Sequence, residues 1–291
     1  MTVRMKYVTF ICALLCMALH ATAQTTEEAK GRLFIIGGNQ TPEIVERFVS
    51  LSGGANANIL VIPFAGGASG DVQATGASLA EKFRGLGCMA DFVFFEKGEA
   101  DLAENLAKLE GVTGVYFSGG SQSKHTSMLL GTNFLERIKE IYRQGGVVGG
   151  SSAGAAVMSK IMITGQDTVN TEPFTSIKEG SVVTPEGFGF IDYAIIDQHF
   201  IQRKRVNRLL SVVIQHQLPG IGIDEATGVI VSGDGTFEVF GDRSVMVLEP
   251  RFTAPPHSDA HGNLGTKGEG ITLRIFLSGD RFTLNQLKTN Q

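Results

Sequence analysis

Cysteine is scarce in this sequence, and the usual signatures of metal and nucleotide sites are missing. Only three cysteines occur among the 291 residues, and no cluster of His, Cys and Asp has the spacing of a zinc site. The pairs Gly37-Gly38 and Gly66-Gly67 could be taken for nucleotide loops, but neither completes a dinucleotide-binding or P-loop pattern. We therefore expect no metal and no cofactor, and we predict that both glycine pairs form turns that line the cleft.

Basic charge is also in short supply. The chain carries 25 Lys and Arg against 29 Asp and Glu, which gives a formal net charge of −4. Domains that bind nucleic acid usually present a basic surface, so no nucleic-acid partner is expected. Internal repeats and low-complexity segments are absent from the sequence as well, and the composition is that of a globular protein.

The start of the chain has the pattern of a targeting segment. Arg4 and Lys6 precede an uncharged, largely apolar run at residues 7–19, and Ala21-Thr22-Ala23 follows it, as in secretory signal peptides. The run is shorter than the roughly 20 residues that a helix needs to cross a bilayer. We predict a signal peptide at residues 1–23, cleavage near Ala23, and an exported protein, periplasmic or extracellular, with no membrane attachment after cleavage.

Cleavage would remove Cys12 and Cys16 and leave Cys88 without an intrachain disulfide partner. We predict that Cys88 is a small, buried, apolar residue. After a short linker at residues 24–31, no stretch rich in Pro or Ser divides the chain. Residues 32–291 are therefore predicted to form a single domain.

Short apolar runs, several ending in glycine, alternate with longer amphipathic segments through much of the chain. This alternation is typical of a parallel sheet covered by helices on both faces. The last part has the pattern of a β-rich meander, and residues 255–268 are expected to form a mobile loop. Strands are predicted at residues 33–38, 59–63, 91–95, 115–120, 146–150, 194–196, 220–224, 229–231, 237–240, 245–248 and 273–277, and helices at 42–51, 72–86, 134–143 and 202–217. The predicted class is an α/β fold with a mostly parallel sheet and an antiparallel edge.

The segment Gly150-Ser151-Ser152-Ala153-Gly154 fits the pattern G-x-S-x-G, in which a nucleophilic serine sits on a sharp turn between a strand and a helix. Small neighbours permit the strained turn, and the helix N-terminus behind it can stabilise an oxyanion. Ser152 is the candidate nucleophile. Ser151 is the alternative, but reading it as the nucleophile puts Ala153 where the last glycine belongs.

A serine hydroxyl needs a base to become a good nucleophile. His199 follows an apolar run and Asp197-Gln198, which predicts a position at the C-terminal end of a strand, where open α/β sheets carry their sites. A structural role is the alternative for a histidine in such a place. His125 and His216 lie in amphipathic segments and are expected at the surface.

A carboxylate that holds the imidazole would complete the set. Asp224-Glu225 ends another apolar run, and adjacent residues of a strand point to opposite faces, so only one of the two is expected to face His199. The spacing does not decide which. Arg205 and Arg208 are i,i+3 neighbours on a predicted helix, where they would form either a paired cationic surface for a substrate carboxylate or an ordinary solvated face.

Four motifs in order resemble the cyanophycinase and dipeptidase E family of serine peptidases. They are Phe117-Ser118-Gly119-Gly120-Ser121-Gln122, Gly150-Ser151-Ser152-Ala153-Gly154-Ala155, Asp197-Gln198-His199-Phe200 with the arginines after it, and Gly222-Ile223-Asp224-Glu225. The similarity extends from about residue 32 to about residue 284 and includes a closing strand pair at 273–284. The third motif, with its arginines, looks more like cyanophycinase than dipeptidase E.

The resemblance implies a class I glutamine amidotransferase-like, flavodoxin-like sandwich and a serine peptidase with Ser152 as nucleophile, His199 as base and Glu225 as the carboxylate. It implies oxyanion donors at the amides of Gly120 and Ala153. The implied substrate-binding residues are Gln122, Asp197, Gln198, Arg203, Arg205 and Arg208. Ser121 departs from the family, since many relatives carry Asp or Asn there, and this departure puts the substrate in question.

The expected partner is a peptide with aspartyl groups, such as cyanophycin, and a homodimer is a possible assembly. One alternative is a dipeptidase that cuts short peptides with an N-terminal aspartate. A second is an α/β-hydrolase esterase, whose histidine would come late in the chain, as His257 or His261. A third is a secreted binding protein that has lost its chemistry.

Overall fold

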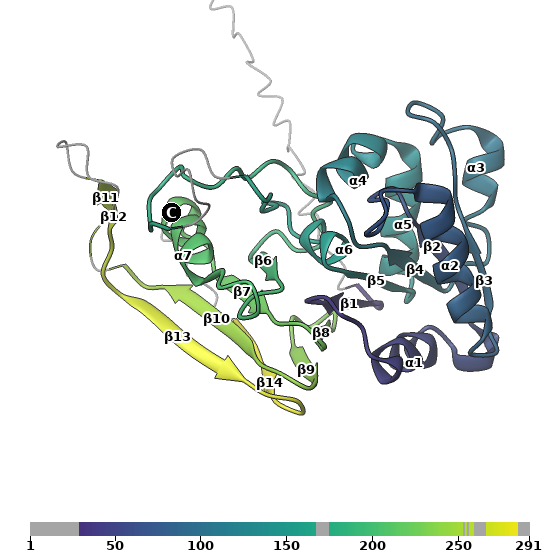
Figure 1. Cartoon of the computed structure of the whole chain (residues 1–291). Helices are drawn as coiled ribbons and strands as arrows, with labels where there is room; N and C mark the ends of the chain where they lie inside the picture. Colours follow the sequence, from purple (N-terminus) through teal and green to yellow (C-terminus); the bar gives the residue numbers. More distant parts are fainter. Residues whose placement is uncertain (1–28, 167–174, 253, 255, 259–265, 285–291) are drawn as a thin grey trace, which may run out of the picture.

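The computed structural model describes residues 29–166, 175–252, 254, 256–258 and 266–284. The predicted signal peptide lies outside the described residues, as do His261 and most of the segment around it. Figure 1 shows helices gathered on both sides of a central sheet, with a second sheet at one end of the molecule.

The main sheet has eight strands in the order β14-β9-β8-β1-β5-β4-β2-β3. Five strands are parallel to one another: β1 (Arg32–Ile36), β2 (Asn58–Ile62), β3 (Met89–Phe92), β4 (Gly114–Phe117) and β5 (Val147–Ser151). The antiparallel part consists of β8 (Thr227–Val231), β9 (Phe237–Gly241) and β14 (Arg281–Phe282). The predicted parallel sheet with an antiparallel edge is confirmed.

Apolar layers bury both faces of this sheet. Alternate residues of β1 enter different core clusters. Phe34 packs against Phe48 of the helix α1 (Pro42–Leu51), whereas Ile35 belongs to the cluster that includes Phe134 of α5 (Asn133–Arg143). Burial on both faces explains why the parallel strands are continuous apolar runs without polar alternation. The helices are α1 (Pro42–Leu51), α2 (Val72–Arg84), α3 (Ala103–Ala107), α4 (Gln122–Leu129), α5 (Asn133–Arg143), α6 (Ala153–Ala156) and α7 (Val206–His216), with a 3₁₀ turn at Gly54–Asn56.

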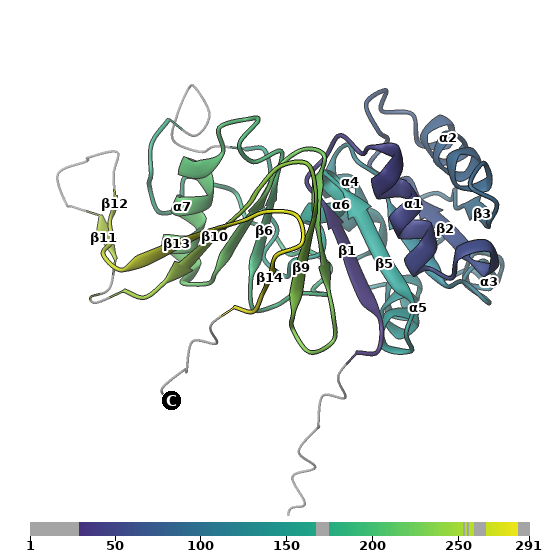
Figure 2. The same ribbon diagram turned by 90° about the horizontal axis from the view of Figure 1, so that it is seen from below.

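A second sheet of four strands was not predicted. Its order is β13-β10-β7-β6, with bounds β6 (Ile195–Gln198), β7 (Gly220–Ile223), β10 (Val245–Pro250) and β13 (Ile271–Phe276). The helix α7 covers part of one face, where Leu209 and Val213 occupy the space that a side chain at Gly220 would fill. Figure 2 shows this sheet and α7 beside the main sheet.

Three expectations need correction. The strands expected to close the chain as a pair, β13 and β14, join different sheets, because β13 pairs with β10 and β14 with β9. Part of the expected mobile loop forms a two-stranded ladder between β11 (His257–Ser258) and β12 (Thr266–Lys267). His125, expected at the surface, is fully buried.

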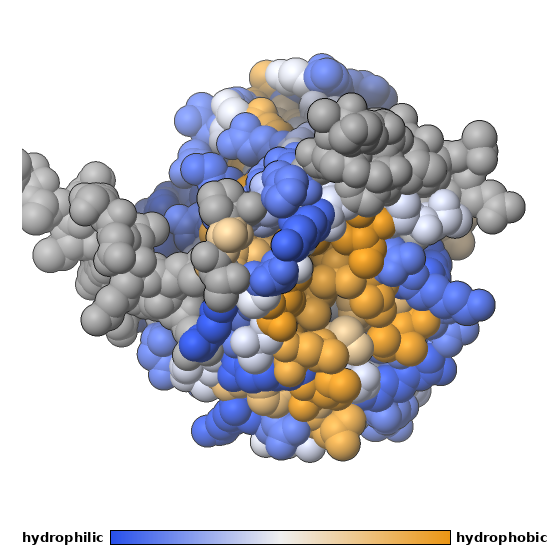
Figure 3. Space-filling model, turned by 90° about the vertical axis from the view of Figure 1, so that its left-hand side faces the viewer, coloured by the Kyte–Doolittle hydropathy of each residue, from blue (hydrophilic) through white to orange (hydrophobic). Residues whose placement is uncertain are grey.

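Figure 3 shows a broad apolar area on the side of the molecule that carries the second sheet. The strand β13 and the residue after it leave Leu273, Ile275 and Leu277 exposed. Cys88 is buried, as predicted from the sequence. Among the residues that the structure describes, none of the helices combines the length and the apolar character needed to cross a bilayer.

Candidate active site

Ser152 occupies a strained turn between the strand β5 and the helix α6. Its φ is 56° and its ψ is −108°, a region that L-residues seldom adopt and that marks functional strain. The flanking glycines make the turn possible, since a Cβ on Gly150 would lie 2.6 Å from the Gly154 carbonyl oxygen, and a Cβ on Gly154 would lie 2.2 Å from that of Phe117. The glycines of the motif therefore allow the close chain crossing beneath the serine.

His199 lies one residue past the end of β6, in the second sheet. Its φ is 49°, and its backbone N–H donates to the Gly37 carbonyl at 2.7 Å. The imidazole lies against Gly38, where an added Cβ would be 2.2 Å from the ring carbon Cε1. The pair Gly37-Gly38, predicted to form a turn that lines the cleft, thus holds the histidine in place. The sequence signal for this role is the position of the pair at the end of a buried strand.

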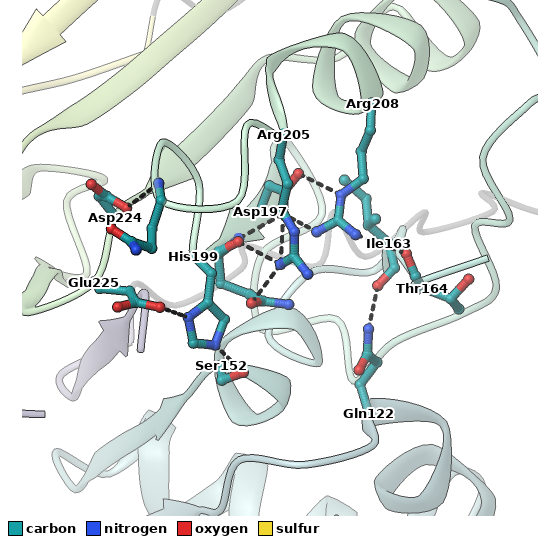
Figure 4. Close-up of polar contacts among 12 residues, drawn as sticks. Gln122, Ser152, Ile163, Thr164, Asp197, His199, Arg205, Arg208, Asp224 and Glu225 are labelled. Carbon is teal, nitrogen blue, oxygen red and sulfur yellow. Dashed lines mark hydrogen bonds and ion pairs between the residues drawn. The ribbon is translucent and has the colours of Figure 1, made fainter. Parts of the chain in front are cut away.

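The imidazole links a carboxylate to the serine hydroxyl (Figure 4). Nδ1 lies 2.7 Å from Glu225 Oε1, and Nε2 lies 2.8 Å from Ser152 Oγ. A carboxylate accepts a hydrogen bond from Nδ1–H, and this leaves Nε2 unprotonated and able to accept a hydrogen bond from the serine hydroxyl. Burial, together with the nearby Arg203 and Arg205 cations, lowers the pKa of His199 below 6.5, while the Glu225 contact opposes that shift. A neutral imidazole at neutral pH is the form that can take up a proton.

Asp224, the neighbour of Glu225, points elsewhere. Its carboxylate is buried and accepts from the Gln202 backbone N–H at 3.0 Å, and it lies 3.4 Å from Arg243 Nη1. The two carboxylates that the sequence could not separate therefore have different surroundings: Glu225 contacts the imidazole, and Asp224 holds the segment after β6.

The two backbone amides predicted as oxyanion donors belong to Ala153 and Gly120. Ala153 is the first residue of α6, so its N–H has no intrahelical acceptor. Gly120 has φ +124°, and a Cβ there would lie 2.2 Å from the Ala65 carbonyl oxygen. A Cβ added to Gly119 would lie 3.6 Å from Ser152 Cβ, so the turn at residues 118–121 packs against the serine.

The predicted binding residues Asp197 and Arg208 form a buried ion pair. The Asp197 side chain is fully buried and that of Arg208 is 1% exposed. Arg208 Nε donates to Asp197 Oδ2 at 2.8 Å, its Nη2 contacts Oδ1, and its Nη1 donates to the Thr164 carbonyl. Arg205 and Arg208 were expected to form either a paired cationic surface or a solvated helix face. Neither expectation holds for Arg208, because its guanidinium faces the interior.

Figure 4 also shows two of the remaining predicted pocket residues, Arg205 and Gln122. Arg205 precedes α7, and its Nη1 donates to the Gln198 carbonyl at 2.6 Å and to Gln198 Oε1 at 2.8 Å. Burial, and then repulsion from Arg208, lowers the pKa of Arg205 to about 10. Gln122 begins α4 and donates to the Ile163 carbonyl at 2.9 Å, while Arg203 is exposed.

Within the described part of the chain, no group of three His, Cys, Asp or Glu side chains is arranged to hold a metal ion. His257, the late histidine of the esterase alternative, lies in β11, a strand of the two-stranded ladder outside both larger sheets.

Comparison with known proteins gives consistent results. The family model of peptidase family S51 matches residues 33–239. Cyanophycinases from Thermosynechococcus vestitus and Trichormus variabilis are each 32% identical, over 88% and 90% of this chain and 80% and 89% of their own lengths. The cyanophycinase of Geminocystis herdmanii is 31% identical over 87% of this chain and 93% of its own.

Solved structures agree on the fold. A peptidase from an acI-B1 actinobacterium superposes with a TM-score of 0.66 at 22% identity, covering 89% of this chain and 98% of its own. A putative peptidase E from Listeria monocytogenes EGD-e reaches 0.52 at 18% identity, covering 74% and 99%. With the family model spanning most of the chain, and with relatives above 30% identity along nearly its full length, this protein belongs to peptidase family S51 and is a serine-type peptidase.

Proposed function

We propose that this chain is an exported peptidase that hydrolyses aspartate-containing peptides, with Ser152 as nucleophile, His199 as general base and Glu225 as the orienting carboxylate. One observation carries the proposal: an unbroken hydrogen-bond chain runs from Glu225 through His199 to Ser152, with spacings of 2.7 and 2.8 Å. The strained backbone of the serine supports the same assignment.

In the proposed reaction, Ser152 Oγ attacks the carbonyl carbon of the scissile amide while its proton passes to His199 Nε2. The tetrahedral intermediate then loses its amine, which takes that proton from the imidazolium as the C–N bond breaks. Water attacks the resulting ester by the same base assistance and releases the acid product and the free serine. Glu225 keeps the proton on Nδ1 and stabilises the imidazolium formed in each half-reaction.

The proposed oxyanion donors are the amides of Gly120 and Ala153. Donors placed in advance where charge develops are the largest single contribution in many enzymes, and losing one costs about 10² to 10³ in kcat. The location of Ala153 at the start of α6 and the packing of the 118–121 turn against Ser152 support this role.

The substrate we propose is cyanophycin, cut to β-aspartyl-arginine dipeptides, or a related peptide with free carboxylates. The relatives named cyanophycinase support this assignment. So does the exposed guanidinium of Arg203, which lies close enough to His199 to shift its pKa. We propose that Arg203, together with Gln122 and Gln198, binds a substrate carboxylate. In this proposal the buried ion pair of Asp197 and Arg208 keeps the pocket residues in position.

The decisive experiment measures turnover of cyanophycin and of Asp-X dipeptides by the mature protein and by two serine variants. Ser152→Ala should remove essentially all activity, because loss of a triad serine costs about 10⁶ in kcat. Ser151→Ala is the matched control and should retain most activity. Turnover of the dipeptides alone would favour the dipeptidase reading, and no product from either substrate would refute the proposed specificity. Greater damage from Ser151→Ala would reassign the nucleophile.

Export and assembly belong to the same proposal. The sequence pattern of residues 1–23 supports export, and N-terminal sequencing of protein recovered outside the cytoplasm should begin at Gln24. The exposed Leu273, Ile275 and Leu277 support a homodimer through β13. Light scattering should then report twice the monomer mass, and Ile275→Lys should reduce it to that of the monomer.

A further inference from the structure

His125 is a fully buried histidine that the proposed reaction leaves unused. It lies in α4, just after the turn at residues 118–121, and its Nε2 lies 3.0 Å from the Ser118 carbonyl oxygen. A backbone carbonyl can only accept a hydrogen bond. Nε2 must therefore carry the proton and donate it to this carbonyl.

The surroundings keep this histidine neutral. Nδ1 has no hydrogen-bond partner within the described residues, and the ring packs edge-on against Phe117, with 5.4 Å between the ring centroids. A second N–H on the ring would be buried without an acceptor, which is costly. Burial accordingly lowers the pKa of His125 to about 4. Near neutral pH the ring is a fixed donor with its proton on Nε2, and it cannot act as a second general acid.

The turn that receives this hydrogen bond is held at several other backbone atoms. Ser118 N–H donates to the Ile62 carbonyl, Gly67 N–H donates to the Gly119 carbonyl, and Ser121 N–H donates to the Ala65 carbonyl, each at 3.0 Å. The Gly120 amide lies between two of these anchors. Because Gly120 has φ +124° and no room for a Cβ, its peptide planes are set by the neighbouring contacts.

The Ser118 carbonyl differs from these backbone contacts because its hydrogen-bond donor is a side chain, that of His125. Its peptide plane ends at the Gly119 nitrogen, and the next plane ends at the Gly120 nitrogen. A rotation of the first plane changes the backbone dihedrals of Gly119 and tilts the second. A Cβ added to Gly119 would lie 3.6 Å from Ser152 Cβ, so such a tilt would occur close to the nucleophile.

We propose that His125 is a positioning residue of the catalytic centre, which holds the Ser118 carbonyl so that the Gly120 N–H points at the oxyanion formed on attack by Ser152. The inference rests on the proposed function, since it takes Gly120 as an oxyanion donor. It adds a residue that contacts neither the substrate nor the triad. The predicted effect therefore appears in the transition state and not in substrate binding.

The test compares two variants of similar shape that differ in one hydrogen-bond donor. His125→Gln can place an amide N–H near the position of Nε2, whereas His125→Met fills the space without a donor. We expect His125→Met to lower kcat about 10- to 100-fold with KM changed less than about two-fold, because a small displacement of a catalytic donor costs up to about 10². His125→Gln should recover most of the loss.

A second readout separates positioning from loss of packing. A peptide aldehyde that forms a tetrahedral adduct on Ser152 should bind the Met variant more weakly by the same factor as kcat falls, while KM stays constant. His216→Met is the matched control: His216 contacts Thr184 at 2.9 Å and not the turn, and its loss should leave kcat unchanged. Melting temperatures exclude unfolding in each variant.

Several outcomes would overturn the inference: a folded Met variant with native kcat, a higher KM at unchanged kcat, or a Gln variant no better than Met. If the Met variant does not fold, His125→Asn replaces it, because the shorter amide does not reach the carbonyl. Failure of the proposed function looks different, since Ser152→Ala would then keep its activity. If activity depends on Ser152 but not on a hydrogen-bond donor at residue 125, the role of His125 is refuted and the proposed function stands.

Discussion

Glu225→Gln is the substitution that most directly tests the proposed charge relay. The carboxylate accepts from His199 Nδ1 at 2.7 Å and has a side chain 17% exposed, so bulk water does little to replace it. A glutamine that turns its amide nitrogen toward Nδ1 forces the proton onto Nε2, which can then no longer accept from Ser152. A glutamine that turns its oxygen inward keeps the tautomer but cannot offset the imidazolium charge.

The expected loss is large in kcat. The equivalent change in the serine protease triad costs about 10⁴, which corresponds to about 5 kcal/mol of transition-state stabilisation at 1.36 kcal/mol per factor of ten. We expect a decrease of about 10³ to 10⁴ in kcat for Glu225→Gln with little change in KM. Steady-state kinetics near neutral pH, with melting temperatures for both proteins, measures this.

Asp224→Asn is the matched control, since it makes the same chemical change one residue away. Asp224 contacts the Gln202 amide and Arg243 rather than the imidazole. Its Oδ1 acceptor survives in asparagine, so kcat should stay within a few-fold and the melting temperature should fall by no more than a few degrees. Near-native kcat in Glu225→Gln together with an inactive Asp224→Asn would refute the carboxylate assignment.

Three further results are expected. Protonation of His199 at low pH removes the base, and the Arg203 cation helps to lower the pKa of His199. Arg203→Gln should therefore raise the pKa of His199 and move the acid limb of the kcat/KM profile to higher pH. An acid limb at the same pH would contradict this. Arg208→Met should destabilise the fold by about 3–5 kcal/mol in urea titrations, since it removes the two-point partner of the buried Asp197 carboxylate and leaves Arg205 Nη1 at 3.9 Å. Arg243 is half-exposed, so Arg243→Met should cost less than about 1 kcal/mol. His257→Ala should retain full turnover, and its inactivity would favour the esterase order.

Most strands of the main sheet could be predicted closely because their local signals agree; β3, predicted at 91–95, is found at Met89–Phe92. The helix α1 runs from Pro42 to Leu51, as predicted, since proline favours the first turn and Ile44, Val45 and Phe48 form one buried stripe. The strand before Ser152 is likewise apolar and ends at the G-x-S-x-G turn. Local pattern and tertiary burial act on the same residues in these segments.

The second sheet and the buried polar groups could not be predicted in this way. A strand of either sheet is a short apolar run, so the sequence does not show that β13 and β14 pair with different partners. Arg208 and His125 lie on helices that look amphipathic, and each is buried because a specific acceptor is present, Asp197 in one case and the Ser118 carbonyl in the other. Such contacts join residues from separate elements, so local periodicity in the sequence does not predict them.

The proposed triad draws its members from both sheets. Ser152 follows a strand of the main sheet, His199 follows a strand of the second, and Glu225 lies on the short connection from β7 to β8 that passes between them. The His199 N–H to Gly37 carbonyl bond and the Ala226 N–H to Gly38 carbonyl bond fasten that junction. In this proposal catalysis therefore depends on the alignment of two sheets that share no ladder of hydrogen bonds. We expect that on heating a slip of the two sheets by about an ångström would lower turnover by up to about 10²-fold while each sheet keeps its own hydrogen bonds, so activity should fall before the circular dichroism signal does.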